Sequence, residues 1–282
     1  MPEREAPASF RRLLFETVVP LLYLKGWGAS AAYRLGGMGR IEVRRYEVAL
    51  PALRAEMRIV FASDFHAGPT TDPRHLDHAA DVIAAERPDL LLLGGDFASF
   101  RAAYVEPLAA RLGSIPAPLG RIGVLGNHDR RTNVAAMVER LERRDIQVLV
   151  NENVRLPAPF DDVFICAFDD WARGRPDPGR AFAGADGTRI VVAHSPSTLS
   201  MIATERFEVM FSGHTHGGQI ALPGGKALYV PHGPYNRAYA SGRFAVGENG
   251  RGTLFVSRGI GCSTVPVRLF APPDVIVVDV HP

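Results

Sequence analysis

The chain of 282 residues is poor in cysteine, has almost no net charge and contains no long apolar run. Its two cysteines, Cys166 and Cys262, exclude both a disulfide scaffold and a zinc site built from thiolates. A net charge of +2 gives no reason to expect nucleic acid as a partner. The longest mainly apolar stretch, Leu13–Leu24, is shorter than the roughly 20 residues that a bilayer-spanning helix needs.

The apolar residues that are present suffice for a large core. A hydrophobic share of 46% with 22% charged residues is typical of a globular protein and excludes a disordered chain, despite 28 Gly and 22 Pro. No repeat, linker or low-complexity tract divides the chain. We therefore predict one compact domain over residues 41–282, preceded by a distinct N-terminal segment over residues 1–40.

This N-terminal segment is basic and amphipathic, and three interpretations of it are open. In the first, it is a helix docked on the protein's own core. In the second, its residues 10–35 lie on a membrane surface with Tyr23, Trp27 and Tyr33 at headgroup depth. As a secretory signal it would end near residues 29–31, but Glu16 interrupts its apolar stretch. We expect a cytoplasmic protein, with peripheral contact to the inner membrane ahead of an exported form.

From residue 41 onward, short apolar runs typical of buried strands recur along the chain. An edge strand is predicted at 41–50, followed by strands at 58–63, 90–93, 121–125, 163–167, 189–193, 208–211, 253–256 and 275–280. Helical periodicity is found at 74–86, 105–112 and 134–144. The helices between the first buried strands predict a parallel sheet, whereas the tail predicts further, partly antiparallel strands. Residues 222–252 predict loops and a hairpin near a binding face.

Polar side chains follow five of these apolar runs directly. They are Asp64 and His66, then Asp96, then Asn127 with His128 and Asp129, then His194, and finally His214 with His216. Ligands of open α/β sheets bind outside the carboxyl ends of the strands, so we expect these side chains to share one crevice. Singly, each is explained as a helix cap or an ordinary histidine. Together, their burial without partners would be costly, and a bound metal removes that cost.

The ligand types and their spacing favour two metal ions. Imidazole, carboxylate and carboxamide groups suit Mn, Fe, Zn or Co, and we expect two divalent ions with Mn ahead of the others. Side chains two residues apart lie on one side of an extended segment, as in Asp64-x-His66 and His214-x-His216. Seven ligands are enough for two ions about 3.5–4 Å apart that share a carboxylate. Asp96 is the expected bridge, because its own loop offers no other ligand.

The same motifs, in this order, resemble those of the calcineurin-like metallophosphoesterases. The resemblance covers the chain from about residue 57 to the end. Residues 213–220 (GHTHGGQI), 257–261 (SRGIG) and 267–273 (VRLFAPP) resemble one bacterial branch, which includes enzymes that cleave UDP-2,3-diacylglucosamine at its pyrophosphate. Members of this branch often carry an N-terminal membrane-associating segment.

The resemblance implies a fold and a set of residue roles. The fold class is α/β, a four-layer α/β/β/α sandwich of two mixed sheets with a dinuclear metal site at the carboxyl ends of the strands. One ion would be held by Asp64, His66, Asp96 and His216, and the other by Asp96, Asn127, His194 and His214. His128 would meet the substrate phosphate without binding metal. Ser99 stands where the family commonly has Asp or Asn, which puts the surroundings of the ligands in question.

The implied activity is metal-dependent phosphohydrolysis of phosphodiester or pyrophosphate bonds by a metal-activated water. His128, oriented by Asp129, would donate a hydrogen bond or proton to the phosphoryl or leaving oxygen. The basic, apolar N-terminal segment and the branch resemblance favour a lipid-linked nucleotide such as UDP-2,3-diacylglucosamine. Alternatives are a general phosphodiesterase or phosphomonoesterase for a small substrate, another metallohydrolase, or a non-catalytic scaffold with the same fold.

Overall fold

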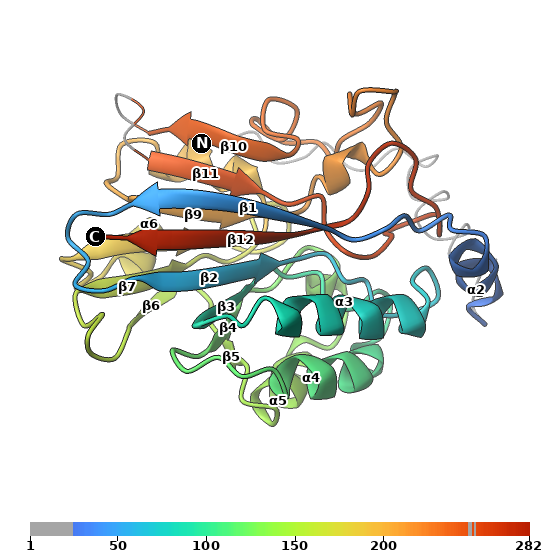
Figure 1. Ribbon diagram of the computed structural model, residues 1–282, viewed down its shortest axis with the longest axis horizontal. Helices are drawn as coiled ribbons and strands as arrows, with labels where there is room; N and C mark the ends of the chain where they lie inside the picture. The colour runs from blue at the N-terminus through green and yellow to red at the C-terminus, as the bar shows by residue number, and fades with distance from the viewer. Residues whose placement is uncertain (1–24, 248–249, 251) are drawn as a thin grey trace.

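A computed structural model describes residues 25–247, 250 and 252–282. Its strands form two six-stranded sheets (Figure 1). The first sheet consists, in spatial order, of β1 (Glu42–Ala49), β12 (Asp274–His281), β2 (Met57–Ala62), β3 (Leu90–Leu93), β4 (Arg121–Gly123) and β5 (Gln147–Val148). The second consists of β10 (Gly242–Val246), β11 (Gly252–Val256), β9 (Val209–Ser212), β8 (Thr188–Val192), β7 (Val163–Ala167) and β6 (Glu152–Arg155).

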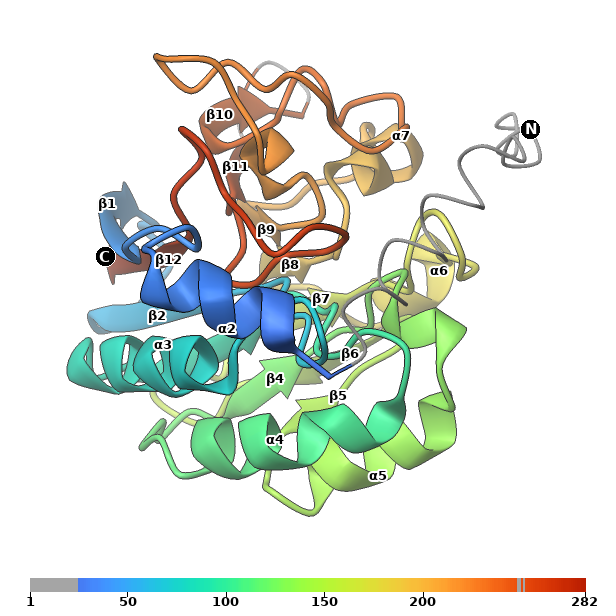
Figure 2. The same ribbon diagram turned by 90° about the vertical axis from the view of Figure 1, so that its right-hand side faces the viewer.

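Helices cover the outer faces of both sheets. Against the first sheet lie α3 (Pro73–Ala85), α4 (Val105–Gly113) and α5 (Val134–Glu142), and against the second lie the short α6 (Pro178–Ala181) and α7 (Leu199–Ile202) (Figures 1 and 2). Single 3-10 turns are η1 (Ala102–Tyr104), η2 (Asp129–Arg131), η3 (Pro196–Thr198) and η4 (His216–Gly218). Apolar layers fill the space between the sheets and on both outer sides. The predicted four-layer α/β/β/α sandwich is confirmed.

Both sheets are mixed. In the first sheet the antiparallel pair β12–β2 separates two parallel parts, and in the second sheet the parallel strands lie between antiparallel edge pairs. Strands β2, β3 and β4 are parallel, as their helical connections predict, while β12 returns antiparallel to β2. All four residues of β3 are leucines buried on both faces, which explains why this strand is a continuous apolar run. Helix α3 begins where the Asp72 side chain accepts a hydrogen bond from the Arg74 amide, with Pro73 at its first position.

The sequence pattern located most elements within one or two residues but missed the short helices α6 and α7 and the strands β5 and β6. These strands are short, and only one of their six residues is buried. They therefore lack the apolar run on which the prediction depends. Strand β1 lies at an edge of its sheet, as predicted, and β10 and β11 form a hairpin at the end of the stretch 222–252.

The described part of the N-terminal segment contains helix α2 (Trp27–Arg34), which packs on the domain. The Ser30 hydroxyl donates to Asp72 at 2.8 Å, and the Tyr33 ring meets His75 edge-on. The cleavage-like residues 29–31 lie within this helix. The predicted apolar stretch Leu13–Leu24 lies outside the described residues. Within the described residues, no helix combines the length and apolarity that crossing a bilayer requires.

Candidate metal centre

The side chains predicted to share a crevice come from five strands of both sheets. Asp64 and His66 follow β2, Asp96 follows β3, and Asn127, His128 and Asp129 follow β4 in the first sheet. His194 follows β8, and His214 and His216 follow β9 in the second sheet. The two sheets therefore deliver their polar residues to one edge of the sandwich, where parallel strands end.

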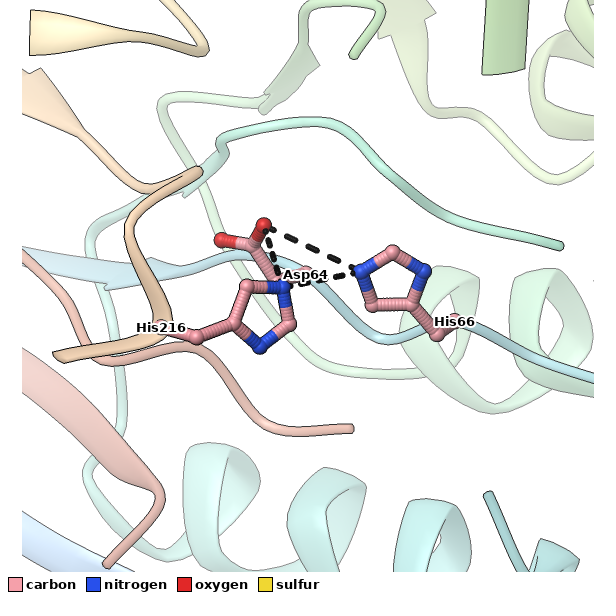
Figure 3. A group of neighbouring side chains, drawn as sticks. All are labelled: Asp64, His66 and His216. Carbon is pink, nitrogen blue, oxygen red and sulfur yellow. Dashed lines mark hydrogen bonds and ion pairs between the residues drawn. The ribbon is translucent and has the colours of Figure 1, made fainter. Parts of the chain in front are cut away.

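One group is formed by Asp64, His66 and His216, whose polar atoms point toward one another (Figure 3). His66 Nε2 lies 3.0 Å from His216 Nε2, and His216 Nε2 lies 3.3 Å from Asp64 Oδ1. All three side chains are buried. Asp96 joins them, because its Oδ2 lies 3.5 Å from His66 Nε2.

A second group shares Asp96 with the first. Asp96 Oδ2 lies 3.4 Å from His194 Nε2, and that nitrogen lies 3.1 Å from both Asn127 Oδ1 and His214 Nδ1. Asp96 Oδ2 thus lies within 3.5 Å of a histidine of each group, which is the position expected of a bridge. The seven predicted ligands lie together, four around each of two points with Asp96 counted twice.

These donor atoms have the spacing of ligands that share an ion. Two ligands about 2.1 Å from one transition-metal ion lie about 3.0–3.4 Å apart. Six separations between donor atoms, at 3.0–3.5 Å, lie within or just above that range. The Asp64 Oδ1 to His66 Nε2 separation is longer, at 4.0 Å. The imidazole, carboxylate and carboxamide groups are also those that Mn, Fe, Zn and Co accept. The residues present therefore fit a pair of divalent ions.

The backbone around the ligands is held in unusual conformations. Asp64, His66, Asp96, His214 and His216 all have positive φ angles, between 47° and 70°. Such angles are uncommon for residues other than glycine and cost free energy. Two neighbours must be glycine for another reason: a Cβ on Gly126 would lie 2.1 Å from Asp96 Oδ1, and one on Gly213 would lie 2.2 Å from Asp64 Oδ2. These strained conformations direct the ligand side chains toward one another.

The charges of the site favour carboxylates in their anionic form. Burial alone would raise the pKa of Asp96, but attraction to His194 and His128 outweighs it and holds the pKa well below the usual value. The pKa of Asp64 is likewise lowered, because the charge of His216 overcomes the effect of burial. Deprotonated carboxylates are the form that binds a cation.

Neighbouring groups orient two of the imidazoles. His194 Nδ1 donates to the carbonyl oxygen of Gly94 at 2.8 Å, which leaves Nε2 as the ligand atom. His66 Nδ1 lies 2.9 Å from the hydroxyl of Ser99, which is fully buried. Ser99 therefore contacts a candidate ligand despite its departure from the family pattern.

One supporting residue was not identified from the sequence. Arg268 is buried, and its guanidinium donates to the carbonyl oxygens of Gly261, Arg258 and Ala271 while Nη2 lies 3.2 Å from His216 Nδ1. It fixes the loop before β12 against η4, which carries His216. The sequence placed Arg268 in the segment 267–273 that resembles one bacterial branch, but gave no indication of its contact with His216.

His128 and Asp129 lie beside the candidate ligands, and the carboxylate of Asp129 binds backbone amides. It accepts hydrogen bonds from the amides of Gly126 and Ala98, at 3.0 and 3.2 Å. Its effect on His128 is thus exerted through the shape of the loop that carries both residues. Burial, together with the nearby charge of Asp96, raises the pKa of Asp129 to about 7.

A cavity of about 300 Å³ opens onto the ligands. His128 lines it beside Asp96 and Asn127, and Phe100, Arg131, Arg173 and Tyr229 also belong to its lining. The cavity thus combines candidate metal ligands with two exposed arginines. Such a site suits an anionic, phosphate-bearing ligand.

Other polar residues in the loops near the cavity have structural partners. Arg130 forms an ion pair with Asp169, and the carboxylate of Asp170 accepts hydrogen bonds from the amides of Ala172 and Arg173. These aspartates hold the loop after β7 beside the cavity. Asn236 is buried and its amide oxygen accepts hydrogen bonds from two serine hydroxyls, so its role is to fix the loop 231–236.

Comparison with known proteins places this arrangement in a family. An uncharacterised metallophosphoesterase of Campylobacter jejuni is 27% identical over 84% of this chain, which spans only 63% of that relative. Phosphodiesterase YaeI of Escherichia coli is 28% identical, with 80% of this chain and 82% of the relative covered. UDP-2,3-diacylglucosamine pyrophosphatase LpxG of Chlamydia muridarum is 27% identical, with 78% and 82% covered.

The family described as calcineurin-like phosphoesterase matches residues 57–218, which is more than half of the chain and includes every candidate ligand. The two-sheet fold, the seven converging ligands and this match agree with one another. The chain therefore belongs to the calcineurin-like phosphoesterase family.

Proposed function

We propose that this protein is a hydrolase of phosphodiester or pyrophosphate bonds that works with two divalent metal ions. The observation that carries the proposal is the convergence of seven imidazole, carboxylate and carboxamide groups at separations of 3.0–3.5 Å on the floor of one cavity. Asp64, His66, Asp96 and His216 would hold one ion. Asp96, Asn127, His194 and His214 would hold the other.

Ions in these positions would supply Lewis acidity, activating a water molecule and offsetting negative charge on the phosphate. These oxygen and nitrogen ligands accept manganese, iron, zinc and cobalt. Manganese is our first expectation among the four. The remaining chemistry belongs to side chains of this chain. The buried ligands exclude bulk water from the floor of the cavity, so that charges there act at close range.

His128 is the residue that we assign to the substrate. It lines the cavity, its backbone amide donates to Asp96 Oδ1 at 2.8 Å, and its ring lies edge-on to His66 with centroids 4.8 Å apart. Its imidazole would donate a proton or hydrogen bond to the phosphoryl or leaving oxygen. Asp129 supports this role by fixing the loop through the amides of Gly126 and Ala98.

For the substrate class we favour a lipid-linked nucleotide such as UDP-2,3-diacylglucosamine. The similarity to a pyrophosphatase named for that substrate supports this choice, as do the arginines that line the cavity. The basic, apolar N-terminal segment over residues 1–40 supports peripheral membrane contact through residues 10–35, from the cytoplasmic side. A general phosphodiesterase with a small substrate is the alternative, supported by the similarity to YaeI.

A substrate panel with metal analysis tests the proposal. Purified protein is loaded with Mn²⁺ and assayed on bis(p-nitrophenyl) phosphate, p-nitrophenyl phosphate and UDP-2,3-diacylglucosamine, while bound metal is counted by mass spectrometry. We expect two ions per chain and cleavage of the diester and the pyrophosphate. Turnover of the monoester alone would overturn the pyrophosphatase assignment. Absence of bound metal together with absence of all turnover would overturn the hydrolase assignment.

A further inference from the structure

Three short extended segments beside the cavity form a small sheet with an inverted pattern of side chains. Ile220 pairs with Leu269, and Ala221 pairs with Ala227. In an ordinary surface sheet the apolar side chains face inward. Here Arg268 and Ala221 are buried, whereas Ile220, Leu222, Val267 and Leu269 are exposed. The apolar side of this small sheet therefore faces away from the protein.

The other large exposed apolar side chains lie at the same end of the molecule. Among the described residues, those exposed by more than a third are Trp27, Leu35, Phe100, Ile220, Leu222, Leu228, Tyr229, Val267, Leu269 and Phe270. All belong to α2 and its flank, to the loop after β3, or to the loops that follow β9 and precede β12. In Figure 2 this end faces the viewer, with α2 in front and the red and orange loops above it. We call Ile220, Leu222, Leu228, Val267, Leu269 and Phe270 the apolar rim.

Helix α2 continues the apolar rim rather than closing it. The amide of Arg268 donates to the carbonyl oxygen of Gly37 at 2.7 Å, which joins the loop before β12 to the chain that leaves α2. Trp27, Ala31 and Leu35 are exposed and four residues apart, so they share the outward face of the helix. The inward face carries the small residues Gly28, Ala29 and Ala32.

Backbone strain indicates that the exposed aromatic residues are not there for stability. Phe270 has a φ of 52° and Phe100 a φ of 71°, yet each has half or nearly half of its side chain exposed. A bulky residue in this left-handed region is strained, and asparagine or glycine would be accommodated at lower cost. Strain held at an exposed position points to a use of the side chain outside the fold.

The charge of this end has one sign. Residues 25–41, 219–240 and 258–273 contain seven Lys or Arg and no Asp or Glu, in a chain whose overall charge is nearly balanced. Lys25, Arg34 and Lys226 are exposed around the apolar side chains. Of the seven, Arg268 is buried and Arg258 forms an ion pair with Glu42. The exposed cations that remain beside the apolar side chains complement a surface that is apolar below and anionic above.

We propose that the apolar rim, with the outward face of α2, docks this end of the protein on an anionic phospholipid bilayer. The rim enters the boundary between headgroups and acyl chains, and Lys226 and Arg34 meet lipid phosphates. Because Tyr229 joins the rim to the wall of the cavity, docking sets the mouth of the metal centre against the headgroup layer. This surface adds the apolar rim to the residues 10–35 proposed above, and it does not depend on what the cavity hydrolyses.

Sedimentation of the full chain with vesicles tests the docking surface. Vesicles of phosphatidylglycerol with phosphatidylcholine are compared with phosphatidylcholine alone. Phe270→Asn removes an apolar anchor while relieving backbone strain, and we expect at least about a fivefold loss of affinity for the anionic vesicles. Arg87→Asn is the matched control, because Arg87 is also exposed with a positive φ of 51° but precedes β3 at the opposite edge. It should bind the vesicles as the unmodified chain does.

A charge reversal gives a second, independent measurement. Lys226→Glu should weaken binding to anionic vesicles about fivefold or more and leave binding to phosphatidylcholine unchanged. Arg206→Glu, an exposed arginine in the turn before β9 at the opposite edge, should have no effect. Hydrolysis of soluble bis(p-nitrophenyl) phosphate should persist in all four variants, so failure of docking and failure of the proposed hydrolase are told apart.

Two results would overturn the proposal. One is equal vesicle binding by the unmodified chain, Phe270→Asn and Lys226→Glu. The other is concentration-dependent dimerisation in sedimentation velocity that Phe270→Asn abolishes while vesicle binding is unchanged, because the rim would then cover a second copy of the chain. A melting temperature of Phe270→Asn equal to or above that of the unmodified chain is expected from the relief of strain.

Discussion

The interior of the sandwich and its ligand-bearing edge are built on opposite principles. Between the sheets, side chains such as Ile59, Phe61 and Phe211 are fully buried in regular strands and pack in one apolar cluster. At the edge, a few residues further along the same chain segments, buried carboxylates and imidazoles crowd together on a left-handed backbone. One chain thus alternates between stabilising and strained conformations within a few residues.

This contrast between interior and edge indicates which interactions offset the strain and desolvation of the site. Each left-handed residue other than glycine costs about 1–3 kcal/mol, and clustered polar groups add desolvation. Burial of apolar side chains in three layers opposes these costs without any metal. The edge is therefore expected to govern chemistry and metal binding, and the interior to govern folding.

Removal of the shared carboxylate should have the largest effect. Asp96→Ala takes a ligand from both groups, and we expect activity to fall by more than about 100-fold, beyond the loss typical for a residue that only supports a ligand. Metal content measured by mass spectrometry should fall with it. Asp279→Ala, at the far end of β12, is the matched control and should keep both ions. Full metal occupancy in Asp96→Ala would contradict the bridging assignment.

His128→Ala should separate catalysis from metal binding. Loss of a general acid lowers the rate about 10²–10⁴-fold, most strongly for substrates with poor leaving groups. We expect both ions to remain, because His128 is assigned to the substrate rather than to a metal. The measurement is kcat on an aryl diester and on an alkyl diester, with metal content of the same sample. Loss of both ions would make His128 a ligand.

Much of this edge was predictable because of strand topology. Parallel strands end at a common edge, so Asp64, Asp96 and Asn127 were expected to meet once the order of apolar runs was recognised. The arrangement of two sheets that brings His194 to them was implied by the family resemblance. The left-handed angles and the inverted small sheet were not predictable, since they depend on contacts between segments far apart in sequence, such as Ile220 with Leu269. The hydrogen bonds of Asp129 to backbone amides depend equally on the folded loop.

A substitution that creates a cavity in the interior should lower the stability of the protein and leave its activity unchanged. Leu90 is fully buried between the sheets at the beginning of β3, far along the strand from Asp96. Leu90→Ala should lower the free energy of unfolding by about 2–5 kcal/mol, measured by urea denaturation. Activity per folded molecule should stay within about twofold at low temperature. A large loss of kcat with unchanged stability would contradict the assignment of folding to the interior and of chemistry to the edge.

Ser99→Ala should give a smaller effect that is confined to the edge. The hydroxyl lies 2.9 Å from His66 Nδ1 and is buried, so its loss frees the imidazole to rotate. Residues that orient a ligand contribute about 10–100-fold to metal affinity. Competition with a fluorescent chelator measures this affinity, and Ser114→Ala, at an exposed helix end, serves as control. An unchanged affinity would show that Ser99 only fills space.

The smallest effect is expected for Asp72, a buried carboxylate at the same edge that is satisfied by protein groups alone. The hydrogen bond from Arg74 is the main cause that lowers the pKa of Asp72 to about 2, and Ser30 contributes a second bond. Because this pKa lies below that of the unfolded chain, the stabilisation is complete above about pH 4 and is lost as the pH falls toward 2. Asp72→Asn keeps a good helix cap but removes the charge. Its stability should therefore fall less steeply than that of the unmodified chain between pH 4 and 2, with or without chelator, as measured by urea denaturation. A chelator-dependent difference would mean that even this carboxylate depends on the metal centre, and the edge would then have no part that is stable by itself.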